Sequence, residues 1–129
     1  MKTREELDHL SRIVFDASVA VHREMGPGLL ESVYQMCLAK EFQLRGIQLQ
    51  PFVPIPLIYK GRKLNKDYVI DILIEDDIVL ELKAIEGILP VHEAQIISYL
   101  KLAEKRLGFL INFNVPLLIS GFKRFVNKF

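Results

Sequence analysis

The first third of the chain repeats apolar residues at the spacing of an amphipathic helix. The first apolar series is Leu7, Leu10, Ile13, Val14, Ala17 and Val21. This series predicts a helix over about residues 4–24. Thr3 and Glu6 stand three residues apart just before it, the pattern of a capping box at a helix start. Gly26-Pro27-Gly28 then ends the helix, because both residue types break helices.

A second helix is expected over about residues 29–45. Its apolar series is Leu30, Val33, Cys37, Leu38 and Leu44. Gly46 follows as the expected C-cap. Cys37 falls on the expected buried stripe, which indicates an inert core thiol.

The pattern changes to strand-like alternation after residue 46. Residues 47–59 alternate apolar positions but include Pro51, Pro54 and Pro56, so this segment is expected at the edge of a sheet. A turn at residues 60–63 and two strands, 68–74 and 78–85, follow.

The last third predicts a helix over residues 91–106 and an apolar strand over 108–113. One or two further strands are expected within 117–126. This order predicts one α/β (α+β) domain over residues 1–129, with a central mixed sheet flanked by helices.

Composition excludes several classes of protein. The chain has 17 basic and 16 acidic side chains, a formal charge of +1, which excludes a strongly basic, histone-like binder of nucleic acid. Cys37 is the single cysteine, so one chain can form neither a disulfide nor a thiolate metal site. No apolar run reaches the roughly 20 residues that a membrane span requires. Residues 1–12 lack the apolar core of a signal peptide. We therefore expect a soluble, cytoplasmic protein without a membrane partner.

Charge is unevenly spread although its total is near zero. Residues 67–86 hold seven acidic side chains and one basic side chain, Lys83. The basic residues just before this segment are Lys60, Arg62, Lys63 and Lys66. They are candidates for phosphate contacts, and a solvated turn is the alternative. The whole pattern fits either ordinary surface charge or a cation site beside a surface that binds a polyanion.

Three charged residues interrupt the otherwise apolar strands 68–74 and 78–85. Asp71, Glu81 and Lys83 are costly there unless they are paired or bind a metal. A two-residue turn would leave Asp71 and Glu81 on different faces. A three-residue loop over residues 75–77 instead pairs Asp71 with Glu81.

We expect this odd-length loop because it sorts the side chains of the two strands by polarity. One face would carry Ile70, Ile72, Leu80 and Leu82. The other face would carry Asp71, Glu81 and Lys83. Two facing carboxylates repel each other, so a divalent cation such as Mg²⁺ or Mn²⁺ is expected between them. The alternative is a surface cluster in which Lys83 pairs with the two acids.

The same residues resemble a known nuclease family. Asp71 followed by Glu81-Leu82-Lys83 looks like the D…(D/E)-x-K core of the PD-(D/E)xK nuclease superfamily. Gly28 to Tyr34 is similar to the G-x-x-E-x-x-Y signature of the small bacterial GxxExxY proteins of that superfamily. The resemblance extends over about residues 10–126 and includes Ile111-Asn112-Phe113. Ile70 stands where the superfamily's name has a proline.

A further match lies on the expected helix over 91–106. Gln95 and Tyr99 have the Q-x-x-x-Y spacing of RecB-type exonuclease domains and share one helix face. Because this pattern is common, a polar helix face with an amphipathic tyrosine is the alternative.

The resemblance implies a restriction-endonuclease-like fold and a Mg²⁺- or Mn²⁺-dependent nuclease acting on nucleic acid, with DNA favoured. It implies that Asp71, Glu81 and the Leu82 carbonyl hold the metal and that Lys83 orients water or stabilises charge. Glu31 would assist them, although at the third position of a helix capped by Gly28 it could serve only as a cap. Gln95 and Tyr99 would contact the substrate or support the site.

Other functions stay open at this stage. A catalytically weak nucleic-acid-binding module and a protein-interaction domain are the alternatives. Tyr34 and His22 are expected to be structural. Phe122, Phe125 and Phe129 fit either a homodimer contact or a closing core strand.

Overall fold

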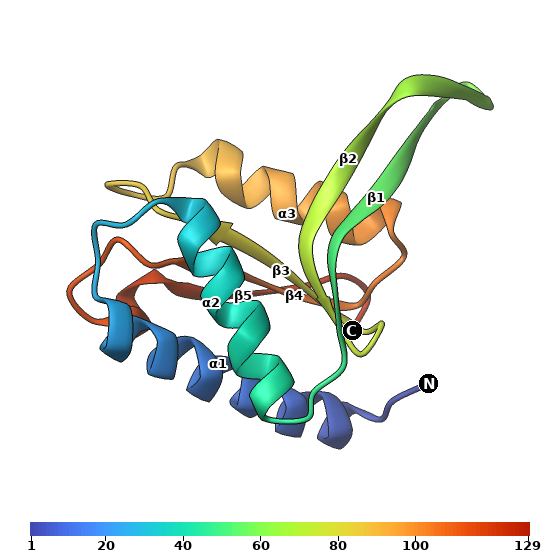
Figure 1. Cartoon of the computed structure of the whole chain (residues 1–129). Coiled ribbons are helices and arrows are strands. Elements are labelled where there is room, and N and C mark those ends of the chain that lie inside the picture. The colour runs from blue at the N-terminus through green and yellow to red at the C-terminus, as the bar shows by residue number, and fades with distance from the viewer.

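The computed structural model describes all of residues 1–129 and contains three α-helices, one short 3₁₀ helix and five strands (Figure 1). In chain order the elements are α1 (Arg4–Met25), α2 (Glu31–Leu44), β1 (Leu49–Tyr59), β2 (Arg62–Ile74), β3 (Ile78–Lys83), α3 (Pro90–Leu102), β4 (Leu107–Asn112), η1 (Leu118–Gly121) and β5 (Phe122–Val126). No helix combines the length and hydrophobicity that crossing a bilayer requires.

The five strands form one mixed sheet in the order β1-β2-β3-β4-β5. β3 and β4 are parallel and are joined by the crossover helix α3, whereas the other neighbours are antiparallel. α1 and α2 cover one face of the sheet, and α3 covers the other (Figure 1). The predicted α/β fold, a central mixed sheet flanked by helices, is confirmed.

Local signals at the helix ends are confirmed. Thr3 N donates to Glu6 Oε1 at 3.0 Å and Glu6 N donates to Thr3 Oγ1 at 3.1 Å, which completes the capping box of α1. At the end of α2, Gly46 N donates to the Gln43 carbonyl at 3.1 Å, and Ile47 N donates to the Phe42 carbonyl at 2.9 Å. This pair of bonds is a Schellman motif, and Gly46 supplies its left-handed residue with φ of 72°.

The predicted buried stripe of α2 is partly wrong. Leu30 and Leu44 are 73% and 71% exposed, whereas Tyr34, Leu38 and Phe42 are fully buried. The helix begins only at Glu31, so Leu30 precedes it. The sheet covers the helix face that carries Tyr34, Leu38 and Phe42, because residues four apart lie on the same face of a helix.

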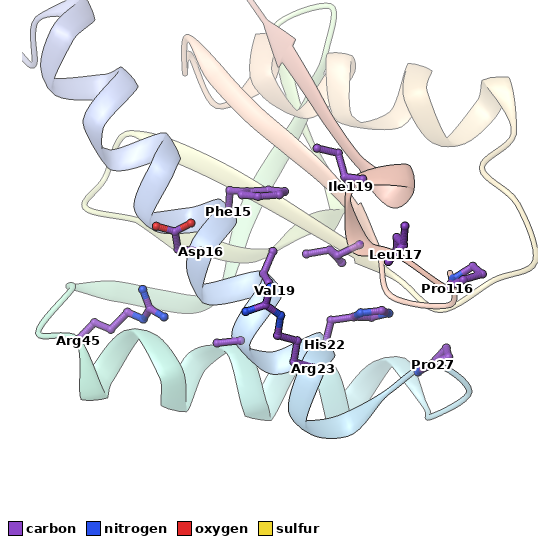
Figure 2. A pocket seen from close by; sticks show the side chains of 12 residues that line it. Phe15, Asp16, Val19, His22, Arg23, Pro27, Arg45, Pro116, Leu117 and Ile119 are labelled. Atoms are coloured by element: carbon purple, nitrogen blue, oxygen red, sulfur yellow. The ribbon is translucent and has the colours of Figure 1, made fainter.

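α1 is tied to the loop that follows β4. His22 Nε2 lies 2.8 Å from the carbonyl oxygen of Val115, so this histidine has a structural partner that the sequence did not reveal. Beside it, α1 and residues 116–119 border a cavity of about 790 Å³ (Figure 2).

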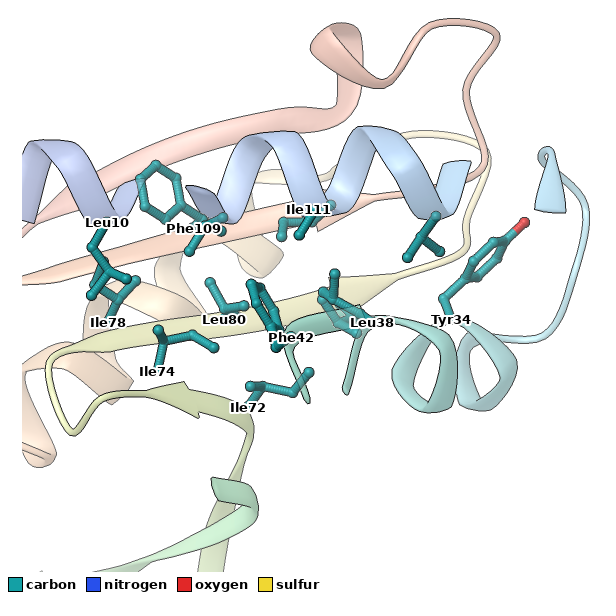
Figure 3. Close-up of a cluster of buried hydrophobic side chains, with 14 of the residues drawn as sticks. Leu10, Tyr34, Leu38, Phe42, Ile72, Ile74, Ile78, Leu80, Phe109 and Ile111 are labelled. Carbon is teal, nitrogen blue, oxygen red and sulfur yellow. The ribbon is translucent and has the colours of Figure 1, made fainter. Parts of the chain in front are cut away.

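The main core fills the space between the sheet and the helices α1 and α2 (Figure 3). Every residue of β4 and all of β3 except Lys83 is buried. A smaller cluster lies under α3 and consists of Ile55, Ile70, Leu73, Val79, Tyr99 and Leu100. Burial on both faces explains why β3 and β4 are nearly continuous apolar runs.

The β2–β3 hairpin has the predicted register. Ile74 pairs with Ile78 and Ile72 with Leu80, so the connection is the three-residue loop Glu75–Asp77. The face predicted for Ile70 is wrong: it belongs to the cluster under α3, on the side of Leu73 rather than of Ile72. The regular alternation of side chains is interrupted between Ile72 and Ile70, where the pairing of β2 with β3 ends. On the neighbouring strand β1, Phe52 has a φ of 54° at the same level.

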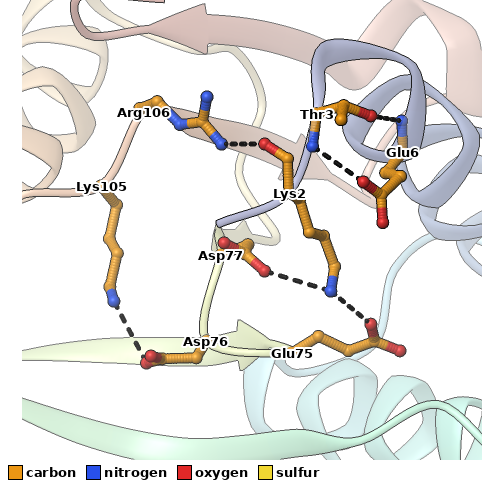
Figure 4. Close-up of polar contacts among 8 residues, drawn as sticks. All are labelled: Lys2, Thr3, Glu6, Glu75, Asp76, Asp77, Lys105 and Arg106. Atoms are coloured by element: carbon orange, nitrogen blue, oxygen red, sulfur yellow. Dashed lines mark hydrogen bonds and ion pairs between the residues drawn. The ribbon is translucent and has the colours of Figure 1, made fainter.

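Ion pairs neutralise the acidic loop at the far end of this hairpin (Figure 4). Lys2 Nζ lies 3.1 Å from Glu75 and 3.4 Å from Asp77, and Lys105 Nζ lies 3.1 Å from Asp76. Exposed pairs of this kind stabilise a fold weakly. For these three acids, the interpretation as ordinary surface charge holds.

Several element boundaries differ from the prediction. α3 ends at Leu102 rather than near residue 106, and η1 occupies the first half of the segment 117–126. β2 begins at Arg62, six residues earlier than predicted, so β1 and β2 form a long hairpin. Its outer part, residues 56–69, extends beyond the body of the molecule and is called the arm below (Figure 1).

Candidate active site and metal centre

Asp71 and Glu81 meet where β2 and β3 separate. The strand pairing ends at Ile72 and Leu80. Beyond it, Asp71 N donates to Glu81 Oε1 at 3.2 Å, and Leu82 N donates to Asp71 Oδ2 at 2.7 Å. The two carboxylates thus take the place of the next backbone hydrogen bonds between the strands.

The Leu82 carbonyl lies on the same side of β3 as Asp71. The N–H and C=O of one strand residue point in the same direction, and those of the next residue point in the opposite direction. Leu82 N donates to Asp71, whereas the Lys83 carbonyl accepts a 3.0 Å bond from Phe113 N on the β4 side. Two carboxylates and one carbonyl therefore share this edge of β3.

Burial opposes ionisation of both carboxyl groups. Glu81 is only 4% exposed, and this burial, followed by the nearby charge of Asp71, raises its pKa to about 9. Burial also raises the pKa of Asp71, against the hydrogen bond from Leu82 N and the charge of Lys83. A bound cation would reverse this balance, because it favours the ionised carboxylates.

Lys83 is held by α3 rather than by the acids. Its Nζ donates to Gln95 Oε1 at 3.3 Å, and Gln95 Nε2 donates to the Tyr99 hydroxyl at 3.0 Å. None of the six ion pairs of the structure includes Lys83, so the alternative of an ion-paired surface cluster is not observed. The ammonium group remains available to a substrate.

Tyr99 completes this hydrogen-bonded chain. Its side chain is buried, and burial followed by the charge of Glu81 raises the pKa of its hydroxyl. Because the hydroxyl accepts its bond from Gln95, its own proton is free for a further hydrogen bond.

Glu31 is the first residue of α2 and does not cap it. Leu30 is the N-cap, and no side chain makes a capping hydrogen bond, so the capping alternative is wrong. Glu31 is exposed, but partial desolvation of its carboxyl group, followed by the charge of Asp71, raises its pKa, whereas Lys83 lowers it. These influences place Glu31 within electrostatic reach of both residues.

Tyr34 fixes the loop that leads into Glu31. Its hydroxyl donates to the Gly26 carbonyl and accepts a 3.2 Å bond from Leu29 N. Its ring stacks on Phe113, with centroids 4.5 Å apart and an angle of 7°. The structural role predicted for Tyr34 is therefore confirmed.

Two supporting residues were missed in the sequence. Gln35 Nε2 donates to the Asp71 carbonyl at 2.6 Å, and buried Asn112 bonds both the N–H and the carbonyl of Ile85, at 3.1 and 2.9 Å. Gln35 stands four residues after Glu31 and so shares its helix face, which is a signal that could have identified it.

The four basic candidates do not join the carboxylates. Their side chains are exposed on the arm, which continues outward from the strand of Asp71 (Figure 1). The set is Lys60, Arg62, Lys63 and Lys66.

The donor set fits a hard divalent cation. No group of three or more His, Cys, Asp or Glu side chains lies together in the structure. Mg²⁺ does not need one, because it commonly binds one or two carboxylates, retains several waters and adds substrate phosphates. Asp71, Glu81 and the Leu82 carbonyl offer only oxygen ligands, which suit Mg²⁺ or Mn²⁺.

A cavity of about 510 Å³ adjoins the site and is lined in part by Lys83, Gln95, Tyr99 and Tyr68. The larger cavity beside His22 contains none of the predicted site residues. We assign more weight to the smaller one, because catalytic chemistry depends on the groups present rather than on volume.

Comparison with known proteins gives one match. Residues 8–125 match the model of a family described as the PD-(D/E)XK nuclease superfamily. Searches of the curated proteins and of the solved structures find no match.

Proposed function

Because the chain belongs to the PD-(D/E)XK nuclease superfamily, we propose that it is a metal-dependent nuclease that hydrolyses phosphodiester bonds of nucleic acid. The observation that carries the proposal is the junction of β2 and β3, where Asp71 and Glu81 are hydrogen-bonded to each other's strands and Lys83 follows on the same strand as Glu81. We include the whole chain, residues 1–129, in one nuclease domain.

Asp71, Glu81 and the Leu82 carbonyl would hold Mg²⁺ or Mn²⁺. When bound, such an ion lowers the pKa of water and offsets the charge of the scissile phosphate. Asp71 would be kept in position by Leu82 N and Gln35, and Glu81 by Asp71 N.

The remaining residues act through charge and position. Lys83, held by Gln95, would orient the attacking water or stabilise the negative charge that develops in the transition state. Tyr99 would support Gln95 and donate a hydrogen bond from its hydroxyl group to the substrate. Glu31 would accept a hydrogen bond from water on the α2 side of the site.

We further assign the chain to the GxxExxY proteins within the superfamily, on the Gly28, Glu31 and Tyr34 spacing. The superfamily implies a nucleic-acid substrate, and we propose DNA. Basic side chains of the arm would contact its phosphates, and the face of the arm that each one occupies decides which of the four do so. A homodimer through the C-terminal segment is part of the same proposal.

One observation favours a second candidate function. Burial favours the neutral forms of Glu81 and Asp71, so a cation must displace protons to bind there, and this cost lowers the metal affinity on which turnover depends. The chain would then be a binding module with a nuclease fold.

The first experiment tests the metal centre by thermal unfolding with and without Mn²⁺. A ligand that binds only the folded state raises the melting temperature. At a free ligand concentration of 100 times the Kd, the free energy of unfolding increases by about 2.7 kcal/mol. We expect this rise in the wild type and in Asp67→Asn, a control with the same charge change on the same strand. Loss of the rise in Asp71→Asn supports the site, whereas an equal rise in all three proteins contradicts it.

The second experiment tests turnover with labelled single- and double-stranded DNA and RNA. Lys83→Ala should lose activity by about 10²–10³-fold, the usual effect of removing one group that stabilises transition-state charge. Lys101→Ala, which removes an exposed charge from α3, is the matched control. Tight binding without cleavage in the wild type would favour the second candidate function.

A further inference from the structure

The arm has two chemically different faces. Along β1, alternation places Ile55, Leu57 and Tyr59 on one face. The register shift between Pro56 and Ile58 adds its two extra residues to β2, so this alternation continues along β1. Tyr68 pairs with Ile55 and Arg62 pairs with Tyr59, so both belong to that face. On the opposite face, Ile58 pairs with Lys63 and Pro56 with Asp67.

The first face leads into the candidate active site. The rings of Tyr68 and Tyr99 lie with centroids 5.2 Å apart, and both line the cavity that also contains Lys83 and Gln95. Ile55, the partner of Tyr68, is buried in the cluster under α3. This surface therefore leads from Lys83 through Tyr68 and Ile55 onto the arm, where it crosses a register shift between Pro56 and Ile58 before it reaches Tyr59.

This face carries an aromatic ring near each end, with positive charge gathered at the outer one. Tyr68 is 38% exposed although it lies beside Tyr99, and Tyr59 is 62% exposed, so both rings are open to a ligand. Arg62 lies opposite Tyr59, and the Lys60 ammonium lies 5.5 Å from the centre of the Tyr59 ring. Rings on which bases stack, with cations for the phosphates, are the features of a surface that binds a single strand.

The arm is long enough to hold several nucleotides. On β1, Tyr59 lies six residues beyond Val53, the partner of Ile70, which at about 3.3 Å per residue is roughly 20 Å. Tyr68 lies near the inner end of this path and Tyr59 near the outer end.

We propose that this face of the arm binds an unpaired nucleic-acid strand and guides it to Lys83, with Tyr59 and Tyr68 stacking on its bases and Arg62 contacting its phosphates. A duplex hides the faces of its bases, so the two rings favour a single-stranded region over a continuous duplex. The part of this inference that leads the strand to Lys83 rests on the proposed nuclease function. The inference also separates the four basic candidates of the arm, because Lys63 lies on the opposite face from Arg62.

The test measures binding by fluorescence anisotropy in EDTA, so that cleavage cannot interfere. The probes are a labelled single strand of about 16 nucleotides, the corresponding duplex, and an abasic strand with the same phosphates. The paired variants are neighbours on opposite faces: Tyr59→Ala with Ile58→Ala, and Arg62→Ala with Lys63→Ala. Tyr59 and Ile58 are equally exposed, at 62% and 65%, so neither substitution endangers folding.

Tyr59→Ala is expected to weaken binding of the single strand about five- to 150-fold, the range of alanine substitutions at stacking rings. It should leave binding of the abasic strand unchanged. Arg62→Ala should weaken binding of both strands and reduce the salt dependence by about 0.7 for a lost phosphate contact. Ile58→Ala and Lys63→Ala should bind like the wild type, and Tyr59→Phe should restore binding.

Equal losses on the two faces would overturn the inference, as would a Tyr59→Ala loss that is the same for the abasic strand, or a preference for the duplex. The expected binding pattern without any cleavage in Mn²⁺ would leave the inference standing and contradict only the nuclease function. Cleavage that is unaffected by Tyr59→Ala and Arg62→Ala would support the nuclease function and contradict the inference about the arm.

Discussion

Among the residues of the candidate site, Glu81 combines deep burial with the nearby charge of Asp71, and both oppose its ionisation. It lies on a strand whose other residues are almost all buried and apolar, and Asp71 is its hydrogen-bonded neighbour. The sequence revealed the cost of such a charge but not its size, because burial depends on the helices that cover the strand. The raised pKa is the measurable consequence.

Metal-free protein is expected to lose stability as the pH rises. The pKa of Glu81 is about 9 in the folded protein and near 4.5 when unfolded, so folding retains a proton that unfolding releases. Its contribution is complete below pH 4.5 and is lost as the pH rises toward 9. At about 1.4 kcal/mol per pH unit, the loss between pH 5 and pH 8 is at most about 4 kcal/mol.

Glu81→Gln should remove most of this pH dependence, because the amide stays neutral and its oxygen still accepts from Asp71 N. Urea unfolding in EDTA at several pH values measures the effect. Glu86→Gln, at an exposed position, is the control and should retain the wild-type slope. An unchanged slope in Glu81→Gln would show that another group is responsible.

At the scale of elements, residues close in sequence to a helix end help to decide where that helix begins or ends. The capping box of α1 and the glycine after α2 were predictable because their hydrogen bonds span only a few residues. The buried stripe of α2 was not, because the sheet selects which side of a helix is covered. Leu30 and Leu44 are as apolar as Leu38 and yet face solvent.

The start of α2 depends on one hydroxyl group. Tyr34→Phe retains the stacking on Phe113 but removes the hydrogen bonds to Gly26 and Leu29. We expect a loss of about 1–3 kcal/mol, because the partners are part-buried. The loop before Glu31 should loosen too, which hydrogen exchange of its amides would detect. A variant with unchanged stability and exchange would contradict this role.

Close packing requires a glycine between η1 and β5. A Cβ on Gly121 would overlap the carbonyl oxygen of Asn112, a backbone atom that cannot move aside cheaply. Gly121→Ala should therefore destabilise by about 1–3 kcal/mol or more. Gly87→Ala is the control, because nothing lies within 4 Å of its Cβ position. Thermal unfolding compares the two, and equal melting temperatures would refute the overlap.

At the scale of the whole molecule, the arm and the body have separate tasks. The body buries the sheet and the carboxylates, whereas almost all side chains of the arm are exposed. Stability should therefore reside in the body, and contact with a long substrate in the arm.

Replacing residues 57–66 by Asn-Gly tests this division. The Pro56–Asp67 pair would then be closed by a two-residue turn. We expect a change in unfolding free energy within about 1 kcal/mol, since few buried groups are lost, together with strongly reduced binding of a single strand. Unfolding of the shortened protein would show that the arm stabilises the body.

The sequence by itself determined the start of α1, the end of α2, the continuous apolar strands, and the odd-length loop that brings Asp71 opposite Glu81. These features follow from interactions between residues close in the chain or from the strict alternation of strands. Only the tertiary structure decided the side taken by Ile70, the support from Gln35 and Asn112, and the length of the arm. Each of these depends on which elements pack together, and packing joins residues that the sequence keeps far apart.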